Sequence, residues 1–260
     1  MTRYWHLGGY ACTAAILVLN AAGCASYKSL VKPVTTLSVL SPELEDLSDF
    51  TIETYLAADA RPAFPSTLAV AKVLSPKRAR YYRNPDAARG QVEILRGDEA
   101  QGWRGMVGSW ENRDETLIEQ VQLISPLIVG DPVNLKSLRD AAALLHAPLL
   151  FVYIQDDNSS EGYNSAAMAY WTIVGLFLVP GNTVGHYTVC QGVLVDTRSG
   201  FILATTEGEA KREEHVLAGA VEIARDRVRE RAQAEAVAAL QDNFRETLAG
   251  LALSRGVRSK

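Results

Sequence analysis

Hydrophobic and polar residues alternate along this chain in two patterns, one typical of strands and one typical of helices. Short, nearly continuous apolar runs at 67–74, 149–154 and 187–196 predict strands that are buried inside a sheet. A further run, at 201–211, predicts a strand that becomes half-exposed, because polar residues alternate along it. The segment 196–200, between the last two runs, ends in a glycine that suits the positive φ of a tight turn. These two strands are therefore expected to form a hairpin.

Apolar residues spaced three and four apart predict the helices. One helix is expected to begin with Asp131 as its N-cap and Pro132 in its first turn, and to stop before Pro148. A second helix is expected over 112–124, followed by a short strand at 127–129. A long helix, roughly 216–251, closes the pattern.

The order of these elements predicts the fold class. Strand, helix, strand, helix, three strands and a final helix indicate an α/β (α+β) fold, in which helices pack on a mixed β-sheet and a long helix lies at the C-terminus. Periodicity is weak between residues 86 and 112. The glycines there predict turns or short strands around Trp103 and Trp110.

The N-terminal region predicts where the protein is held. Arg3 precedes an apolar stretch that closes on small residues before Cys24, which is the pattern of an export signal. The residues that follow are rich in serine, threonine and proline, as in a flexible tether. The expected organisation is a signal peptide at 1–23, a lipidated N-terminus and tether at 24–66, an α/β domain at 67–253 with an apolar insertion at 166–181, and a basic tail at 254–260.

The segment Ala21-Ala22-Gly23-Cys24 resembles the lipobox of bacterial lipoproteins. The resemblance implies that Cys24 becomes the first residue of the mature chain and carries a diacylglycerol and a further acyl chain such as palmitate. Ala25 and Ser26 follow the cysteine. By the sorting rule of that family, they imply an anchor in the outer membrane, with the protein on the periplasmic face.

The net charge of the chain narrows the choice of binding partners. The chain has 26 basic and 30 acidic side chains, a net charge of −4. Phosphate binding needs clustered positive charge, so nucleic acid is not an expected partner.

Cys12 leaves with the signal peptide and Cys24 is consumed by lipid, so Cys190 has no cysteine to pair with in the mature chain. Its apolar surroundings predict a small buried side chain.

The insertion at 166–181 is the most unusual stretch of the sequence. It is apolar, but it is too short for a membrane-spanning helix, which needs about 20 residues. Three interpretations stay open: a flap over the core, a surface that contacts membrane or a protein partner, and a part of an oligomeric pore. Exposed apolar patches mark interaction sites, so the candidate contact residues are Tyr170, Trp171, Leu176 and Phe177.

Sequence patterns typical of catalysis or of metal binding are absent. The oxygen-rich segment 156–162 lacks the glycine and the glutamate that an EF-hand needs, so it is expected to be a polar loop. His146, His186 and His215 show no metal-ligand spacing. We expect no catalytic residue, no metal, no cofactor and no enzymatic activity. A hydrolase would need a cleft that brings His186 or His215 to carboxylates.

Four segments of the mature chain together resemble a periplasmic α/β module: 68–73, 138–155, 193–203 and the closing helix. This module is shared by the curli-secretion lipoprotein, the outer-membrane activators of penicillin-binding proteins and the N-terminal domain of the Tol-system propeller protein. The resemblance implies a non-enzymatic docking or assembly module that binds an unknown envelope protein. It leaves open an alternative, a homo-oligomeric secretion channel component of the curli type.

Overall fold

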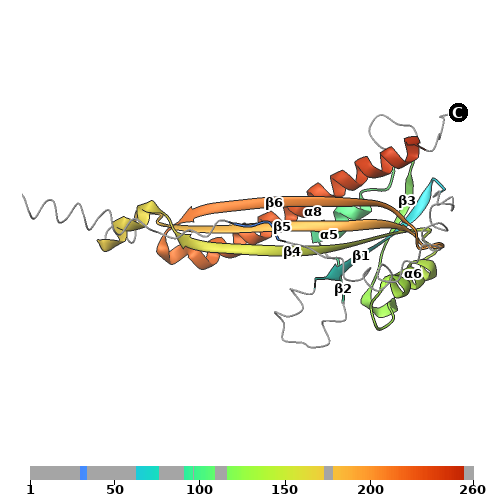
Figure 1. Cartoon of the computed structure of the whole chain (residues 1–260), viewed down its shortest axis with the longest axis horizontal. Coiled ribbons are helices and arrows are strands. Elements are labelled where there is room, and N and C mark those ends of the chain that lie inside the picture. Colours follow the sequence, from blue (N-terminus) through green and yellow to red (C-terminus); the bar gives the residue numbers. More distant parts are fainter. Residues whose placement is uncertain are drawn as a thin grey trace, which may run out of the picture. The chain divides into compact units, whose positions relative to one another are not determined.

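The computed structural model describes residues 30–33, 63–75, 91–95, 97–108, 116–172 and 178–254. Within these ranges the chain forms a six-stranded mixed sheet with helices packed on it (Figure 1). The elements are β1 (Ser66–Leu74), β2 (Val92–Glu93), α5 (Gly97–Arg104), β3 (Ile118–Leu123), η2 (Pro126–Ile128), α6 (Leu135–Leu144), β4 (Leu149–Tyr163), η3 (Ser165–Trp171), β5 (Asn182–Asp196), β6 (Ile202–Val216), η4 (Ala218–Ala220) and α8 (Val221–Ser254). The helices of this described part are all too short or too polar to span a bilayer.

Strand β1 lies inside the sheet and fixes its register. On one edge it pairs in parallel with β4, from Leu68 opposite Leu149 to Leu74 opposite Gln155. Its other edge is shared by the parallel strand β3 and the short antiparallel strand β2. Beyond β4, β5 runs back between β4 and β6 (Figure 1). The turn from β5 to β6 places Gly200 at φ +80°, which confirms the expected hairpin.

Each face of the sheet is covered by helices because side chains alternate along every strand. On one face, β1, β4 and β5 pack against Leu138 of α6. On the other face they pack against Trp103 of α5 and Leu240 of α8. Cys190 is fully buried in this second core, as its apolar surroundings predict. The α/β fold with a long C-terminal helix is confirmed.

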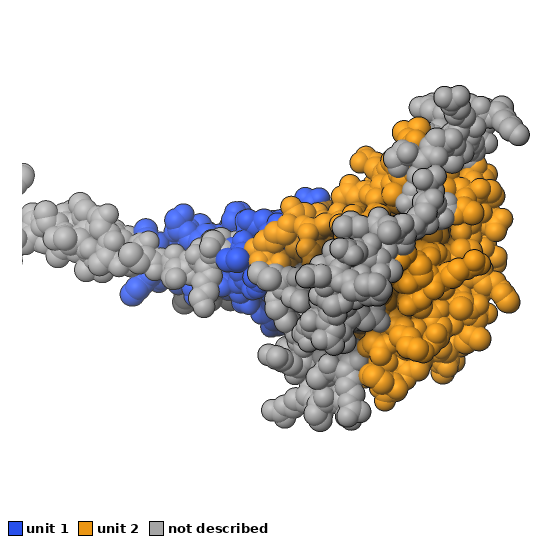
Figure 2. Space-filling model, turned by 45° about the vertical axis from the view of Figure 1, so that its right-hand side comes forward, with its two compact units in different colours: residues 1–31, 158–187, 211–232 blue, residues 32–157, 188–210, 233–260 orange. Residues whose placement is uncertain are grey.

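The chain divides into two compact units, which Figure 2 shows in blue and orange. Apart from the gaps given above, unit 1 holds residues 30–31, 158–187 and 211–232. Unit 2 holds residues 32–157, 188–210 and 233–254. Strands β4, β5 and β6, each 15 residues long, and helix α8 contribute to both units.

In unit 2, α8 packs very closely on β6 at one glycine. A Cβ atom placed on Gly208 would lie 2.2 Å from the backbone nitrogen of Leu240 and 2.4 Å from the carbonyl oxygen of Ala236. Both helix residues are fully buried. This contact therefore requires glycine at position 208 of β6.

Three local predictions are wrong, each because tertiary contacts override the pattern. The helix expected over 112–124 is replaced in its described part by strand β3, because β1 offers an open edge that Ile118–Leu123 fills. The strand expected at 127–129 is the 3₁₀ helix η2, where Ser125 Oγ accepts the N–H of Leu127 at 3.3 Å. The turns expected near Trp103 form helix α5, which buries that ring, and Trp110 lies outside the described residues.

Two further expectations need correction. The polar loop expected at 156–162 is the second half of β4, because the neighbouring strand β5 satisfies its backbone hydrogen bonds. Helix α6 begins at Leu135 rather than beside Asp131. Its N-cap is Asn134, which forms a capping box with Ser137, with hydrogen bonds of 2.8 and 2.9 Å.

Candidate functional site

Unit 1 has a small core of its own. It lies among the end of β4 (158–163), the start of β5 (182–187), the end of β6 (211–216) and the first turns of α8. Val184, Val216 and Ala224 are buried together, with the partly buried Ala220 and Val221 packed against them. Because this core is small, several large side chains of the connections around it stay at the surface.

The connection from β4 to β5 is held at both ends by Asn164. Its side-chain oxygen accepts the N–H of Ala166 at 2.9 Å and so caps η3. Its side-chain nitrogen donates to the carbonyl of Pro180 at 2.9 Å, and its backbone nitrogen donates to Gly181 at the same distance. The start and the end of the insertion are thus tied to one residue, which fixes the position of η3.

Tyr170 packs η3 onto the start of β5. Its hydroxyl accepts hydrogen bonds from the Gly181 nitrogen at 2.8 Å and from Asn182 Nδ2 at 2.9 Å. A Cβ atom on Gly181 would lie 2.6 Å from Ala167 Cα and 2.7 Å from Tyr170 Cζ, so only glycine permits this contact. The ring of Tyr163 meets that of Tyr170 edge to face, with centroids 6.4 Å apart.

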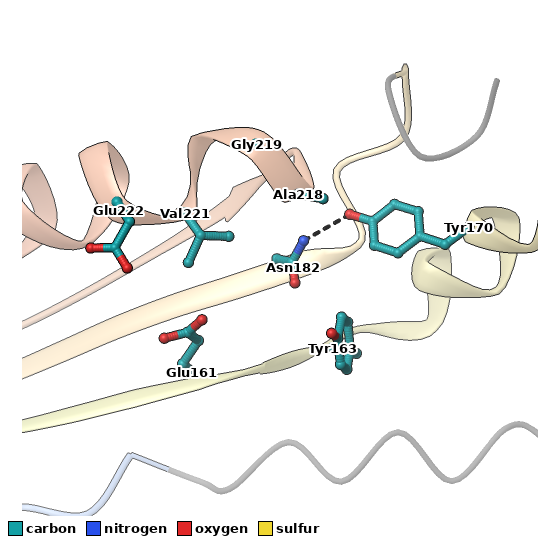
Figure 3. A pocket seen from close by; sticks show the side chains of 8 residues that line it. All are labelled: Glu161, Tyr163, Tyr170, Asn182, Ala218, Gly219, Val221 and Glu222. Atoms are coloured by element: carbon teal, nitrogen blue, oxygen red, sulfur yellow. Dashed lines mark hydrogen bonds between the residues drawn. The ribbon is translucent and has the colours of Figure 1, made fainter. Parts of the chain in front are cut away.

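An open pocket of 350 Å³ lies beside these tyrosines, within unit 1. Figure 3 shows the two tyrosine rings toward one end of the pocket and two carboxylates toward the other. The lining residues are Glu161 and Tyr163 of β4, Tyr170 of η3, Asn182 of β5, Ala218 and Gly219 of η4, and Val221 and Glu222 of α8.

The two carboxylates share one cation. Arg225 Nη1 donates to both oxygens of Glu222 at 3.1 Å, and Arg225 Nη2 donates to Glu161 at 2.5 Å. The hydrogen bond with Glu161 is the main cause that raises the pKa of Arg225. One positive and two negative side chains leave this end of the pocket with a net charge of −1.

Large apolar side chains are exposed on and around η3. The exposed fraction is 85% for Trp171, 72% for Leu178, 59% for Tyr163 and 38% for Met168. We call these four residues the η3 surface. Tyr163 ends β4, and Met168 and Trp171 lie on η3, which the hydrogen bonds of Asn164 and Tyr170 hold in place.

The structure separates the residues that the sequence suggests as contacts. Trp171 is exposed, whereas the half-buried Tyr170 positions η3 and lines the pocket. Leu176, Phe177 and Cys24 lie outside the described residues, so the roles predicted for them stay predictions. The sequence analysis did not name Tyr163, Met168 and Leu178 as contact residues. Tyr163 could have been found from the two-residue alternation of a long β4.

The histidines of unit 1 bind hydroxyl groups. His186 Nδ1 lies 2.8 Å from Ser159 Oγ, and His215 Nδ1 lies 2.8 Å from Thr183 Oγ1. In the part of the chain that the structure describes, no three histidine, cysteine or acidic side chains gather where they could hold a metal ion.

A second group of polar side chains is buried in unit 2, where it supports the fold. Lys72 Nζ binds Glu99 at 2.9 Å and Gln155 at 3.0 Å. Tyr153 donates to Glu99 at 2.7 Å and accepts from Trp103 Nε1 at 3.3 Å. Burial and, after it, the charge of Glu99 raise the pKa of the Tyr153 hydroxyl.

Comparisons with known proteins give little further information. No family model matches the chain, and no curated protein matches its sequence. Among solved structures, the LpoB C-terminal domain from Salmonella enterica aligns with 62% of this chain and 93% of its own length, at 13% identity and a TM-score of 0.24. Similarity at this level does not establish a shared fold.

Proposed function

We propose that this protein is a lipid-anchored, non-enzymatic docking module of the bacterial envelope, which binds another protein through the η3 surface. The observation that carries the proposal is the exposure of Trp171 and Leu178, at 85% and 72%, on a connection fixed by Asn164 and Tyr170. Contiguous exposed apolar patches mark interaction sites, whereas single exposed apolar residues such as Leu127 are common, and tryptophan is enriched among the residues that dominate binding energy.

The fixed backbone favours binding over a loosely covering flap. A preorganised surface loses less conformational entropy on association than a mobile one. Asn164 closes the connection at both of its ends, and Tyr170 ties η3 to β5. Trp171 is then presented to solvent at a defined place instead of folding over the core.

The pocket beside the η3 surface supports recognition rather than catalysis. Among the described residues that line it, there is no serine, cysteine, histidine or lysine that would act as a nucleophile. Arg225 already binds both of its carboxylates, Glu161 and Glu222. We therefore propose a binding role for the pocket as well.

The lipobox-like segment that ends at Cys24 supports an anchor in the outer membrane. An acyl anchor at Cys24 would lie six residues before Leu30, which is buried, and eight residues before Lys32, which binds Glu207 and Glu209 of β6. Such a module would bind its partner within the periplasm while it stays attached to the membrane.

Photocrosslinking from position 171 tests the proposed function. A photoreactive phenylalanine derivative replaces Trp171 in the full chain in intact cells, and a matched variant carries it at Leu127, which is 93% exposed on η2 in unit 2. We expect one discrete protein product from position 171 and none of that mass from position 127. The proposal is wrong if position 171 yields only phospholipid adducts, or if both positions give the same products.

A further inference from the structure

We infer that the pocket of unit 1 receives a lysine or arginine side chain of the docked protein. This inference rests on the proposed function and names the chemistry of the partner. It is drawn from the size of the pocket, the separation of its aromatic and acidic ends, and the bonds that its lining residues already make.

The pocket is large enough to receive one long side chain. Its volume of 350 Å³ lies near the lower end of the range of about 300–1,000 Å³ that is usual for ligand sites. It opens beside the η3 surface, since its lining includes Tyr163, which belongs to that surface, and Tyr170 of η3. A residue of a protein docked on Trp171 would therefore be within reach of the pocket.

The aromatic end suits the stem of a basic residue, whose charge is drawn into the pocket past the rings. Tyr163 and Tyr170 meet at an interplanar angle of 85°, so they form two perpendicular walls. Cations are attracted to the faces of aromatic rings within about 6 Å of the centroid. Val221 and Ala218 add apolar surface, on which the methylene stem of lysine or arginine packs.

The acidic end supplies the counter-charge. Glu161 and Glu222 carry two negative charges, and Arg225 neutralises one of them. The chain's own guanidinium thus shows that the geometry of these carboxylates accepts such a cation. A partner's cation would bind the remaining charge, or displace Arg225 from it.

The hydroxyl of Tyr170 supplies a donor next to this site. It accepts two hydrogen bonds, from Gly181 and Asn182, so its own proton remains to be donated. The backbone carbonyl of a bound peptide offers the acceptor that this proton needs. A basic residue within a peptide therefore satisfies the pocket better than a free amine does.

Ligand-observed NMR on the full chain in detergent tests the inference. The probe is a blocked pentapeptide, Gly-Ser-Lys-Ser-Gly, compared with the same peptide carrying norleucine instead of lysine and with n-butylamine. We expect the lysine peptide to bind more tightly than both. Glu161→Gln should weaken its binding about fivefold, the upper range of an exposed ion pair.

Arg225→Gln should change the affinity for the lysine peptide in the opposite direction to Glu161→Gln. Loss of the internal cation changes the net charge of the acidic end from −1 to −2, so the lysine peptide should bind about threefold more tightly. The matched control is Glu230→Gln, because Glu230 is exposed on α8 outside the pocket lining. It should leave binding unchanged, and thermal unfolding of each variant confirms that it is folded.

Three results would overturn the inference. They are equal binding of the norleucine peptide, equal effects of Glu161→Gln and Glu230→Gln, and butylamine binding as tight as that of the peptide. Failure of the proposed function is distinguishable from these results. If the proposed function is wrong, crosslinking from position 171 gives no protein product, while the pocket still prefers the lysine peptide.

Discussion

Replacing Gly208 by alanine should destabilise the fold through one steric contact. The added Cβ would lie 2.2 Å from Leu240 N, 2.4 Å from Ala236 O and 2.6 Å from Leu240 Cα. All three are backbone atoms, so no side-chain rotation relieves the overlap, and α8 has to move away from β6. Leu240 and Phe244, both fully buried in the core below this contact, would lose packing as a result.

The expected magnitude follows from the nature of the obstacle. Overpacking a core costs about 1–3 kcal/mol, and the upper end applies here because helix backbone must shift. A domain of about 150–250 residues changes its Tm by about 2–4 °C per kcal/mol, so a loss of about 3 kcal/mol lowers Tm by about 6–12 °C. Without the contact, alanine in place of a strand glycine would stabilise by about 0.5–1 kcal/mol.

Thermal unfolding followed by circular dichroism measures this effect. Gly250→Ala is the matched control, because Gly250 lies in α8 with no atom within 4 Å of an added Cβ. That substitution should stabilise the protein by about 0.8–1 kcal/mol through helix propensity. A Gly208→Ala variant as stable as the wild type, or more stable, would refute the close packing of α8 on β6.

Three further outcomes are expected. The pKa of Tyr153 is raised in the folded protein, so the unfolded chain loses this proton first, and wild-type stability falls as pH rises through the usual tyrosine pKa of about 10. Tyr153→Phe should remove this alkaline loss of stability, which urea unfolding between pH 8 and 10.5 measures. Gly181→Ala should displace η3, including Tyr170, from the start of β5 and so speed limited proteolysis within 165–171. Gly219→Ala, whose added Cβ meets no atom within 4 Å, is the control, and equal cleavage rates of the two variants would contradict the prediction. Cys24→Ala should abolish the mass of the acyl groups in the membrane-extracted protein, and a wild-type mass equal to that of unmodified residues 24–260 would exclude the anchor.

The sequence predicts the strands and the final helix because their side chains carry the pattern themselves. Continuous apolar runs identify β1 and the first half of β4, and regular spacing identifies α6 and α8. The polar half of β4 carries no such signal, since its backbone is satisfied by pairing with β5, the strand that follows the connection at 164–181. Strand β3 is missed for a similar reason, because its place depends on the edge of β1.

The candidate site was predictable only in part. Trp171 stands out in an apolar insertion, and it is exposed in the structure. Glu161 and Glu222 lie 61 positions apart in the sequence, and only the packing of β4 and α8 in unit 1 brings them to one pocket. No observation on the described residues favours an oligomeric channel over a docking module, so that alternative stays untested.

The most direct measurement of the central claim is the affinity of the full chain for the protein captured from position 171. Wild type is compared with Trp171→Ser, and Leu127→Ser serves as the exposed apolar control. A dominant interface residue contributes at least about 2 kcal/mol, so we predict binding about thirtyfold weaker for Trp171→Ser and unchanged for Leu127→Ser. Equal affinity of the wild type and Trp171→Ser would contradict docking through the η3 surface.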